Sequence, residues 1–344
     1  MRGRIVLDAT YSVGKNLSGV GVYCRRILCG VAGAHPAERF AAAFRSQRVM
    51  QSGQFHLPGN VIRTLLWDGG VVARVRLFHG LNQRMPRFAV PRSCCTFHDL
   101  FVMTGEYSAT EYRERFTQQA REAAARSGIV ICVSQFTAGQ VHDLLGVERS
   151  RLRVIHHGAT PRNAPEVTRE PWILSAGAIQ KRKNILRLVE AFERASTPPW
   201  RLVLAGSKGF GAGEVMARVN ASPARDRIDV TGYVDDPILD SLYAKASIFA
   251  FPSLDEGFGM PALDAMASGI PVLSSNRSAL AEVCGDGALL VDPERVDEME
   301  NGLKRLIEDD GLRQALVTRG LARASQFSWE RAAQLTWDVY RELL

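Results

Sequence analysis

Short apolar segments rich in Val, Ile, Leu and Phe alternate along the chain with longer segments in which apolar residues recur every three or four positions. The short segments predict strands and the longer ones predict amphipathic helices. Because the strands are apolar at successive positions, both of their faces are expected to be buried, as in a parallel sheet covered by helices on each side. The expected strands span residues 4–9, 40–44, 76–79, 94–98, 129–133 and 153–155 in the first half, and 172–175, 201–205, 228–231, 247–251, 271–274 and 288–291 in the second.

A proline-rich stretch separates the two series of strands. Residues 158–171 include three prolines in fourteen positions, a composition typical of a linker. We therefore expect an α/β protein with two doubly wound, Rossmann-like domains, residues 1–160 and 161–328, that face each other across a cleft. Ligands of open parallel sheets bind beyond the carboxyl ends of the strands, so residues that directly follow the expected strands are the first candidates for a site.

The composition argues against several other classes of protein. Of the 344 residues, 46% are hydrophobic and 23% are charged, which is typical of a soluble globular protein. No run of about 18 apolar residues occurs, and the N-terminus becomes polar too early for a signal peptide. The six cysteines form no C-x-x-C pair, so reduced thiols are expected rather than disulfides or a zinc site. Together these features predict a cytoplasmic protein.

The charge is divided unevenly between the two halves. Residues 1–160 contain 21 Lys and Arg but 10 Asp and Glu, a net charge of +11, whereas the rest of the chain contains 22 and 26, a net charge of −4. This division indicates that the first half meets an anionic partner. The charge alone leaves nucleic acid, anionic lipid and phosphorylated substrates open as that partner.

One loop in the basic half has the pattern of a membrane-binding segment. Residues 83–92 place three arginines, Arg84, Arg87 and Arg92, among the apolar residues Met85 and Phe88. Cations could then meet lipid headgroups while apolar side chains enter the interface. The pattern therefore predicts a peripheral protein on the inner face of the cytoplasmic membrane, with a solvated basic loop as the alternative.

Acidic residues interrupt an apolar region of the second half, among them Glu256 and Asp264. Glu256 lies on an expected loop directly after a strand, and Asp264 lies in the first turn of a helix predicted from Pro261 to Ser268, with Gly269 as its cap. Such a place suits a nucleotide sugar, because carboxylates bind hydroxyls and loop amides bind phosphates. The alternative is that Asp264 only complements the helix dipole while Glu256 is a solvated loop acid.

Three other short motifs follow predicted strands. Arg182 and Lys183 lie between a strand and a helix N-terminus, which predicts either an anion site or a solvated basic turn. Gly19 and Gly21 open a helix after the first strand, as in a dinucleotide site or a tight turn. His98 ends a strand in the text Thr-Phe-His-Asp-Leu. A histidine in that place is either catalytic or structural.

The motifs together resemble those of the retaining family 4 glycosyltransferases, which have the GT-B fold. The resemblance rests on Glu256-Gly-Phe-Gly-Met-Pro261, on Arg182-Lys183-Asn184 and on the ending Phe327-Ser-Trp-Glu-Arg331, and over residues 1–160 only on short motifs. The family usually has a second Glu where this chain has Asp264, whose side chain is shorter by about 1.5 Å, one carbon–carbon bond. The absence of a D-x-D text disfavours the metal-dependent glycosyltransferase architecture.

The resemblance implies a role for each candidate residue. Glu256 contacts the transferred sugar, and Asp264 holds the ribose of the nucleotide. Arg182 and Lys183 stabilise the departing pyrophosphate, and His98 contacts the donor sugar and phosphate. His79 does no more than line the cleft, and a last helix, residues 329–344, packs back on the first domain. The other donor-binding residues that the resemblance implies are Gly19, Gly21, Gly206, Tyr233, Gly257, Phe258, Gly259 and Met260.

These implications predict a retaining glycosyltransferase. Its donor would be a nucleotide diphosphate sugar, preferably GDP-mannose, and its acceptor a glycan or lipid-linked glycan in bacterial-type polysaccharide synthesis, with no metal or other cofactor. Retention is expected through front-face attack, in which the leaving phosphate takes the acceptor's proton. An epimerase or phosphorylase of the same fold is one alternative. A non-catalytic basic protein that binds membranes or nucleic acid is the other, although nucleic acid is not the expected partner.

Overall fold

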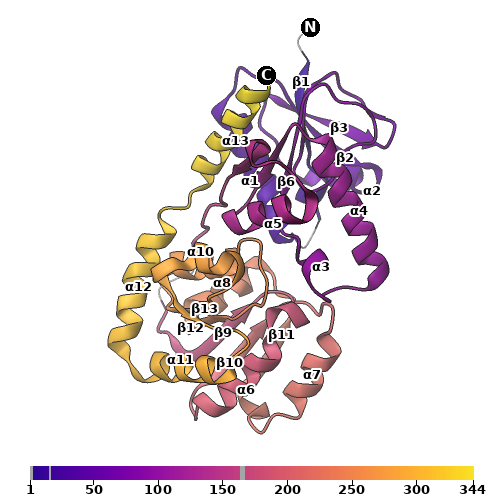
Figure 1. Cartoon of the computed structure of the whole chain (residues 1–344). Helices are drawn as coiled ribbons and strands as arrows, with labels where there is room; N and C mark the ends of the chain where they lie inside the picture. The colour runs from indigo at the N-terminus through magenta and orange to yellow at the C-terminus, as the bar shows by residue number, and fades with distance from the viewer. Residues whose placement is uncertain (1–2, 15–16, 163–166) are drawn as a thin grey trace. The chain divides into compact units, whose positions relative to one another are not determined.

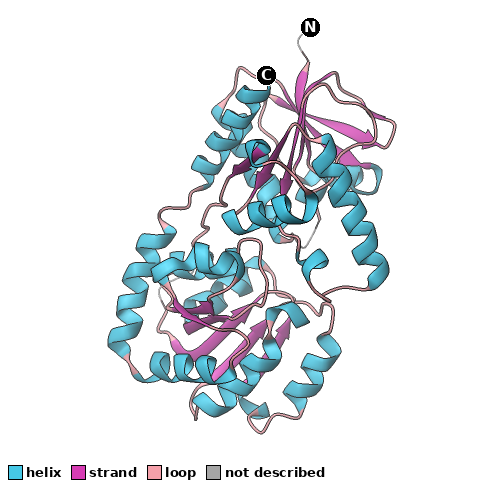
Figure 2. Cartoon of the chain, in the orientation of Figure 1, coloured by secondary structure: helices cyan, strands magenta, loops and turns pink. Residues whose placement is uncertain are grey.

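The computed structural model describes residues 3–14, 17–162 and 167–344 (Figures 1 and 2). Two compact units make up the chain. The first contains Met1–Thr104, Thr110–Gly158 and Ser328–Leu344, and the second contains Gly105–Ala109 and Ala159–Phe327. The division after Gly158 lies two residues before the boundary predicted at residue 160, and the short segment Gly105–Ala109 belongs to the second unit although it lies within the first predicted domain.

An eight-stranded sheet forms the centre of the first unit, in the order β4-β3-β2-β1-β5-β6-β7-β8. Neighbouring strands are parallel except at the β3–β4 edge, which is antiparallel. The strands are β1 Arg4–Asp8, β2 Phe40–Arg45, β3 Val61–Trp67, β4 Gly70–Val71, β5 Val75–Gly80, β6 Ser93–Phe97, β7 Ile129–Cys132 and β8 Leu152–Val154. The α-helices are α1 Gly19–Ala34, α2 Ser46–Val49, α3 Phe101–Thr104, α4 Thr110–Arg126, α5 Gln135–Leu145 and α13 Trp329–Leu343, with 3-10 turns at Thr10–Ser12, Met50–Gln54 and Arg149–Arg151.

The sequence did not predict β3 and β4, and the expectation of wholly parallel sheets is wrong at this edge. β3 carries exposed side chains, among them Ile62 and Trp67, between buried ones. It therefore lacks the continuous apolar run that marks a strand buried on both faces. The chain reverses through Asp68-Gly69 and returns antiparallel as β4, so that the edge of the sheet is a short hairpin.

A six-stranded parallel sheet forms the centre of the second unit, in the order β11-β10-β9-β12-β13-β14. A large cluster of buried aliphatic and aromatic residues packs helices onto it. The strands are β9 Glu170–Ala176, β10 Arg201–Ala205, β11 Ile228–Gly232, β12 Ala246–Phe251, β13 Val272–Ser275 and β14 Leu289–Val291. The helices are α6 Ile185–Ala195, α7 Ala212–Asn220, α8 Asp236–Lys245, α9 Met260–Ala267, α10 Ser278–Cys284, α11 Val296–Glu308 and α12 Asp310–Ala324, with 3-10 turns η4 Lys181–Lys183, Arg225–Arg227 and Gly285–Gly287.

The C-terminal helix α13 packs within the first unit, against α1. Gly30 allows the close approach, because a Cβ built on it would lie 2.9 Å from the Ala333 Cβ. His79 on β5 adds a polar connection to the same helix. Its ring nitrogens lie 2.6 Å from the Tyr340 hydroxyl and 2.9 Å from the Thr96 hydroxyl. His79 is completely buried, so its expected place in the lining of a cleft is wrong.

The apolar residues of loop 83–92 belong to the core of the first unit. Met85 is 9% exposed, and Phe88 packs against the buried residues beneath it. Met85 is therefore already buried by the protein and Phe88 is partly buried, which argues against the insertion of these two side chains into a membrane interface. Arg87, in contrast, is 78% exposed in its side chain and lies 3.8 Å from an Asp68 carboxylate oxygen. Only the charge of the loop is left to bind an anionic surface.

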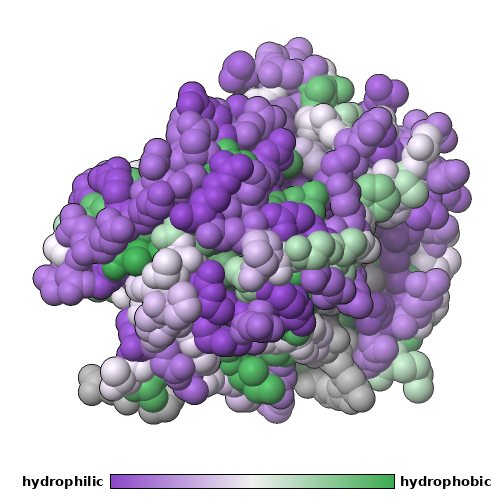
Figure 3. All heavy atoms as spheres, turned by 90° about the horizontal axis from the view of Figure 1, so that it is seen from below, coloured by the Kyte–Doolittle hydropathy of each residue, from purple (hydrophilic) through white to green (hydrophobic). Residues whose placement is uncertain are grey.

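Surface and redox features agree with an ordinary globular chain. None of the helices in the described part of the chain is long and apolar enough to cross a membrane. The face shown in Figure 3 is mainly hydrophilic, with apolar residues in small separate patches. All six cysteines are free thiols, as the sequence predicts.

Candidate active site

The loop that carries Glu256 connects β12 to α9, and we call residues 252–259 the acid loop. It ends at Gly259, whose φ of +95° favours glycine. A Cβ at this position would also lie 2.3 Å from the Leu280 Cδ2 of α10. Helix α9 begins at Met260, one residue before the predicted start, and has no acid in its first turn. Asp264 therefore lies in the second turn, and the idea that it complements the helix dipole is wrong.

Glu256 is buried between two cations. The residue is 8% exposed, its Oε1 lies 2.8 Å from the Arg182 Nη1, and it forms a second ion pair with the Lys183 Nζ. Burial alone would raise the pKa of this carboxyl, but the charges and hydrogen bonds of Arg182 and Lys183 lower it to about 2. The carboxylate is thus ionised at neutral pH, and the alternative of a solvated loop acid is wrong.

The two cations come from the turn η4, which follows β9. Arg182 is 7% exposed, and its Nη1 also donates to the Asp255 carbonyl. Lys183 places its Nζ 4.3 Å from the centre of the Phe251 ring. The Leu254 N–H donates to the Arg182 carbonyl at 2.9 Å, which ties the turn to the acid loop. These cations are part of a buried cluster with Glu256, so the alternative of a solvated basic turn is wrong for both.

Two residues that the sequence did not single out hold the acid loop in place. Asn184 has a left-handed backbone, with φ of 60°, and its side-chain amide donates to the carbonyls of Pro252 at 3.1 Å and Pro293 at 2.6 Å. Ser278 accepts a hydrogen bond from the Glu256 N–H at 3.1 Å. Asn184 is part of the motif Arg182-Lys183-Asn184, but the sequence assigns a role only to the two charged residues of that motif. Ser278 had no signal in the sequence.

Asp264 contacts the segment that enters the second unit. Its Oδ1 accepts a hydrogen bond from the Thr160 N–H at 2.8 Å, and the Ser268 hydroxyl on the same helix accepts one from the Arg162 N–H at 3.0 Å. The Arg162 side chain forms an ion pair with Asp240 on α8, with 3.2 Å between Nη1 and Oδ1. The side chain that we expected to hold a ribose therefore also anchors the main chain.

The remaining candidates of the second unit lie beyond the carboxyl ends of β10 and β11. Gly206 approaches the chain after β9 so closely that a Cβ on it would lie 1.9 Å from the Gly177 carbonyl oxygen. Its N–H donates to the Gly232 carbonyl at 2.9 Å. Tyr233 follows directly and is 51% exposed. Three loops are thereby joined at one edge of the sheet, where ligands of open α/β sheets bind.

The candidates of the first unit lie beyond β1 and β6. Gly19 begins α1, and Gly21 is buried so tightly that a Cβ on it would lie 2.7 Å from the Tyr11 carbonyl oxygen. The Ser18 hydroxyl caps this helix by accepting from the Gly21 N–H at 3.3 Å. His98 follows β6 and is 6% exposed. The structure thus places each of them at the end of a strand or the start of a helix, as predicted.

His98 belongs to a buried group of rings. Its Nε2 lies 3.0 Å from the Leu81 carbonyl oxygen, its ring packs edge-on against Tyr23 at 4.7 Å, and it stacks on His157 at 5.6 Å. Burial lowers the pKa of His98 to about 4, against a smaller opposing effect of the Leu81 contact. Since a carbonyl only accepts, the neutral ring carries its proton on Nε2, and Nδ1 is an acceptor. His157 packs between His98 and Trp329.

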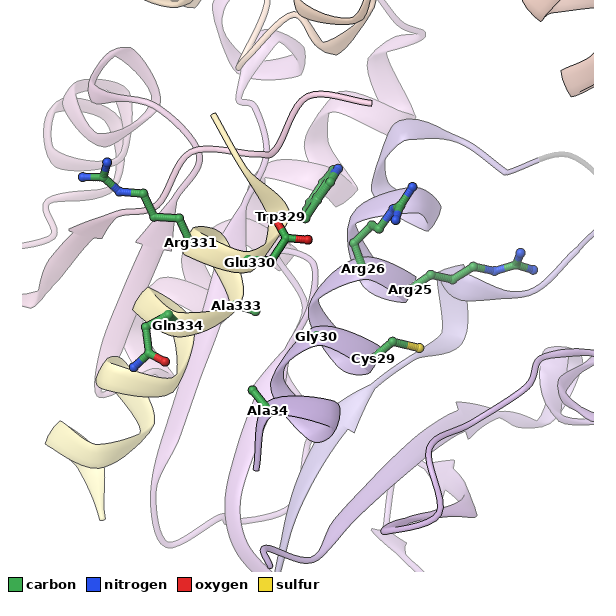
Figure 4. A pocket seen from close by; sticks show the side chains of 10 residues that line it. All are labelled: Arg25, Arg26, Cys29, Gly30, Ala34, Trp329, Glu330, Arg331, Ala333 and Gln334. Carbon is green, nitrogen blue, oxygen red and sulfur yellow. The ribbon is translucent and has the colours of Figure 1, made fainter. Parts of the chain in front are cut away.

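A groove of about 840 Å³ lies between α1 and α13, within the first unit (Figure 4). In Figure 4, Arg25 and Arg26 extend from α1 to one side and Arg331 extends from α13 to the other. The cations therefore do not converge on one point, and none of the predicted site residues lines the groove. Within the described residues, no group of three or more His, Cys, Asp or Glu could hold a metal ion.

Comparison with known proteins supplies the family. A model described as Glycosyltransferase Family 4 matches residues 31–162, and one described as Glycosyl transferases group 1 matches residues 159–323. The O-antigen chain mannosyltransferase B of Escherichia coli is 30% identical over 284 residues, which are 78% of this chain and 74% of that protein. The chain belongs to glycosyltransferase family 4. The serotype-specific mannosyltransferase WbdA of Escherichia coli is 27% identical to this glycosyltransferase over 283 residues, 76% of the chain but 35% of that protein.

Solved structures agree with the fold. The glycosyltransferase is similar to sucrose-phosphate synthase from Thermosynechococcus elongatus, with a TM-score of 0.78, 21% identity and coverage of 99% of both chains. It is also similar to Anabaena HepE, solved with UDP and glucose, with a TM-score of 0.76, 17% identity and coverage of 99% of this chain and 100% of that one. The family and the GT-B fold with two parallel-sheet α/β domains, which the motifs predicted, are thus confirmed.

Proposed function

We propose that this glycosyltransferase moves a sugar, with retained anomeric configuration, from a nucleoside diphosphate sugar to a glycan or lipid-linked glycan. The observation that carries the proposal is the buried, ionised Glu256 between Arg182 and Lys183. Burying charges is costly, and such clusters are typical of sites where charge develops during a reaction. A diphosphate gains negative charge as its bond to the sugar breaks, and the two cations are suited to stabilise it.

The same cluster gives Glu256 a second role when the donor binds. A diphosphate that binds at Arg182 and Lys183 competes with the Glu256 carboxylate for these two cations, because both anions form charge-assisted contacts with them. The sugar is attached to that diphosphate, so it lies next to the carboxylate. Positive charge develops on the sugar as the bond to the leaving group breaks, and Glu256 is placed to stabilise it.

Retention then follows from attack on the face that the leaving group departs from. The bond between the anomeric carbon and the phosphate oxygen breaks, and the bond to the acceptor oxygen forms on the same face. The proton of the acceptor hydroxyl passes to the leaving phosphate. In this scheme Glu256 orients and stabilises the sugar and forms no covalent bond to it.

His98 is better suited to a sugar hydroxyl than to a phosphate. Its Nε2 proton is directed at the Leu81 carbonyl, so the neutral ring offers only the Nδ1 lone pair, which accepts from a hydroxyl. We therefore assign the phosphates to Arg182 and Lys183, and in the first unit to the backbone near Gly19 and Gly21. The sequence-based expectation that His98 contacts both the donor sugar and the phosphate is thus reduced to a contact with the sugar.

The preferred donor is GDP-mannose, bound without a metal. The choice of mannose rests on the relatives, since two of those most similar in sequence are described as mannosyltransferases. Gly257, Phe258 and Gly259 of the acid loop and Met260 at the start of α9 would surround the sugar and phosphates, while Gly206 and Tyr233 would line the base pocket. Asp264 would share its carboxylate between the ribose and the Thr160 N–H.

We also propose that an acceptor in polysaccharide synthesis is presented at an anionic membrane surface, which the first unit contacts by charge. The support is the net charge of +11 over residues 1–160. Sedimentation with anionic and neutral vesicles tests this, with an Arg84/Arg87/Arg92→Glu variant beside the wild type. Binding of wild type to anionic vesicles at low salt, reduced in the variant, is expected. Equal sedimentation of the two proteins contradicts it.

A donor screen tests the central proposal. Purified protein is incubated with GDP-mannose and with several UDP-sugars, with and without oligomannose acceptors, and the product is analysed by NMR. Release of GDP from GDP-mannose and an α-linked product are expected. A β-linked product contradicts retention, and a free epimerised sugar or a sugar phosphate indicates an epimerase or a phosphorylase. Binding without turnover in every condition contradicts the enzyme proposal.

A further inference from the structure

Two non-glycine residues in the described ranges, 3–14, 17–162 and 167–344, have a left-handed backbone. They are Asn184, with φ of 60°, and Ser278, with φ of 55°. This conformation brings the Cβ of an L-residue close to its own backbone and costs energy, more for serine than for asparagine. Strained residues of this kind are concentrated at functional sites. Both of these residues hold the acid loop, although they come from opposite sides of it in the sequence.

Ser278 and its neighbour contact the backbone of Glu256 on both sides. The Ser278 Oγ accepts a hydrogen bond from the Glu256 N–H at 3.1 Å, and the Ala279 N–H donates to the Glu256 carbonyl at 3.2 Å. Glu256 is therefore held by its donor and by its acceptor through two consecutive residues. Farther along α10, Leu280 packs against Gly259, where a Cβ would lie 2.3 Å from the Leu280 Cδ2. The first turn of α10 thus fixes the acid loop at two points.

The loop contains another serine that has no such function. The Ser253 hydroxyl is fully buried, and it has no hydrogen-bond partner within the described part of the chain. Of the two serine hydroxyls, only that of Ser278 contacts Glu256. Because the carboxylate must meet two cations and then a sugar, its main chain has to be held in place before the donor binds.

We propose that Ser278 is a positioning residue of this glycosyltransferase, whose hydroxyl holds the Glu256 main chain at the cost of a strained backbone. The inference rests on the proposed role of Glu256. The inference predicts that a substitution of Ser278 changes the stability of the fold and the rate of transfer in opposite directions. Glycine at this position removes the strain and the hydroxyl together, whereas threonine keeps the hydroxyl and increases the strain, because it is β-branched.

The test compares Ser278→Gly, Ser278→Thr and Ser278→Ala with the wild type. The expected results for Ser278→Gly are a melting temperature equal to or above that of the wild type, a kcat for transfer lowered about tenfold and a donor KM within twofold. Ser278→Thr is expected to melt at a lower temperature with kcat within threefold of wild type. Ser278→Ala is expected to lose about as much kcat as the glycine variant. If the threonine variant does not fold, the alanine and glycine variants still test the proposal.

A matched control comes from Ser275, the last residue of β13, three positions before Ser278. The Ser275 hydroxyl accepts from the Arg277 N–H at 3.1 Å, a contact of the same kind that does not involve Glu256. Ser275→Ala is expected to lower the melting temperature with kcat within twofold of wild type. A Ser278→Gly enzyme with wild-type kcat overturns the inference, as does an equal loss of kcat in Ser275→Ala.

Calorimetry with GDP and with UDP adds a readout that a general structural defect would change. Whichever nucleotide the wild type binds, its Kd is expected to be within threefold in Ser278→Gly, since Arg182 and Lys183 are intact. A larger loss of nucleotide binding contradicts a role through Glu256. Glu256→Gln with full activity overturns the proposed function itself. Full activity of Ser278→Gly beside an inactive Glu256→Gln overturns only the positioning role.

Discussion

The first unit buries three histidines as neutral rings, whereas the second buries a carboxylate and two cations as ions. In the first unit, hydrogen bonds join the hydroxyls of Tyr23 and Thr96, the Thr96 hydroxyl and the His79 ring, and the His79 ring and the Tyr340 hydroxyl. Burial lowers the pKa of His79 to about 3, and the proximity of the titratable His98 lowers this pKa by a smaller amount. This network connects α1, two strands and α13 without any net charge.

The cluster of the second unit has a different energetic character. Apolar residues of similar size would cost less free energy to bury than the charged side chains of Glu256, Arg182 and Lys183. The two sites therefore differ in kind. Buried polar groups that only connect elements of the first unit are neutral and hydrogen-bonded, whereas the second unit buries charges where a charged ligand is proposed to bind.

Glu256→Gln is expected to have the largest effect. The amide cannot balance the two cations or the positive charge on the sugar, so kcat/KM for transfer should fall at least 100-fold, or about 2.7 kcal/mol of transition-state stabilisation. The fold should be retained in circular dichroism. Glu294→Gln is the matched control, because Glu294 forms an exposed ion pair with Arg277 at 2.7 Å. A loss of less than tenfold in Glu256→Gln contradicts the central role of the carboxylate.

Removal of both cations should weaken diphosphate binding by about 30- to 100-fold. Titration calorimetry with GDP and guanosine, or with UDP and uridine, is expected to show this loss for Arg182→Ala/Lys183→Ala with the diphosphate only, since charge-assisted contacts are made to the phosphates. Lys181→Ala is the control from the same turn, where Lys181 is exposed. Equal losses for nucleoside and nucleoside diphosphate would remove the pair from the phosphate site.

The two units should differ in their response to acid. A histidine whose folded pKa is lowered stabilises the fold fully above its ordinary pKa of 6.5, and this stability is lost as the pH falls toward the folded pKa, about 4 for His98 and about 3 for His79. The loss is about 2 kcal/mol per buried histidine at pH 5. The stability from Glu256, whose pKa is lowered from 4.5 to about 2, is lost only below pH 4.5.

Hydrogen exchange measured by mass spectrometry between pH 7.5 and 5, corrected for the intrinsic rate, distinguishes the units. The protection of β5, β6 and α13 should fall while that of β9 and β12 is kept. Replacement of the exposed His56 by Gln is the control and should leave the pH dependence unchanged. A uniform loss of protection across both units contradicts the comparison.

Tyr340→Phe should have a smaller effect, confined to stability. It removes the hydroxyl that lies 2.6 Å from the His79 Nδ1 in a fully buried place, which costs about 1 to 2 kcal/mol of the free energy of unfolding. Urea denaturation measures this cost. Tyr11→Phe, which changes a 38% exposed ring, is the control and should be neutral. A fall in transfer rate larger than the loss of folded protein would show that the network also serves the reaction.

Removal of metal should have no effect on transfer. The proposed positive charge at the diphosphate comes from Arg182 and Lys183, so treatment with EDTA is expected to leave the rate within twofold. The measurement is made with the donor identified in the screen and repeated after addition of Mg²⁺ or Mn²⁺. A rate that falls tenfold with EDTA and returns with Mn²⁺ contradicts the metal-free proposal.

Periodicity and short motifs were sufficient for the parallel core and for the candidates at the strand ends. Strands such as β10 and β12 are apolar at nearly every position, and this signal does not depend on distant residues. The sequence also placed Glu256, Arg182 and Lys183 at the carboxyl ends of strands. It could not show that they form one cluster, because the contact joins turns separated by 73 positions in the chain.

Other features depend on contacts that leave no local trace. Ser278 is an ordinary serine in the sequence, and only the position of α10 against the acid loop gives its hydroxyl a partner. Met85 and Phe88 form an amphipathic pattern with the neighbouring arginines, and only the core beneath them shows that Met85 is buried and Phe88 partly buried. β3 lacks a two-sided apolar run because its place near the sheet edge exposes some of its residues.

The ion pairs of Glu256 also have a consequence for selectivity against ordinary cellular anions. Inorganic phosphate and other small anions are abundant competitors for any exposed pair of cations. Here each small anion must displace the Glu256 carboxylate, which is already bound to Arg182 and Lys183. A small anion makes no further contacts that would offset this cost. A sugar nucleotide brings contacts along its whole length, so it can overcome the same obstacle. The carboxylate thus acts as a built-in competitor, and Glu256→Gln, besides losing transfer, should be inhibited by phosphate buffer far more strongly than the wild type.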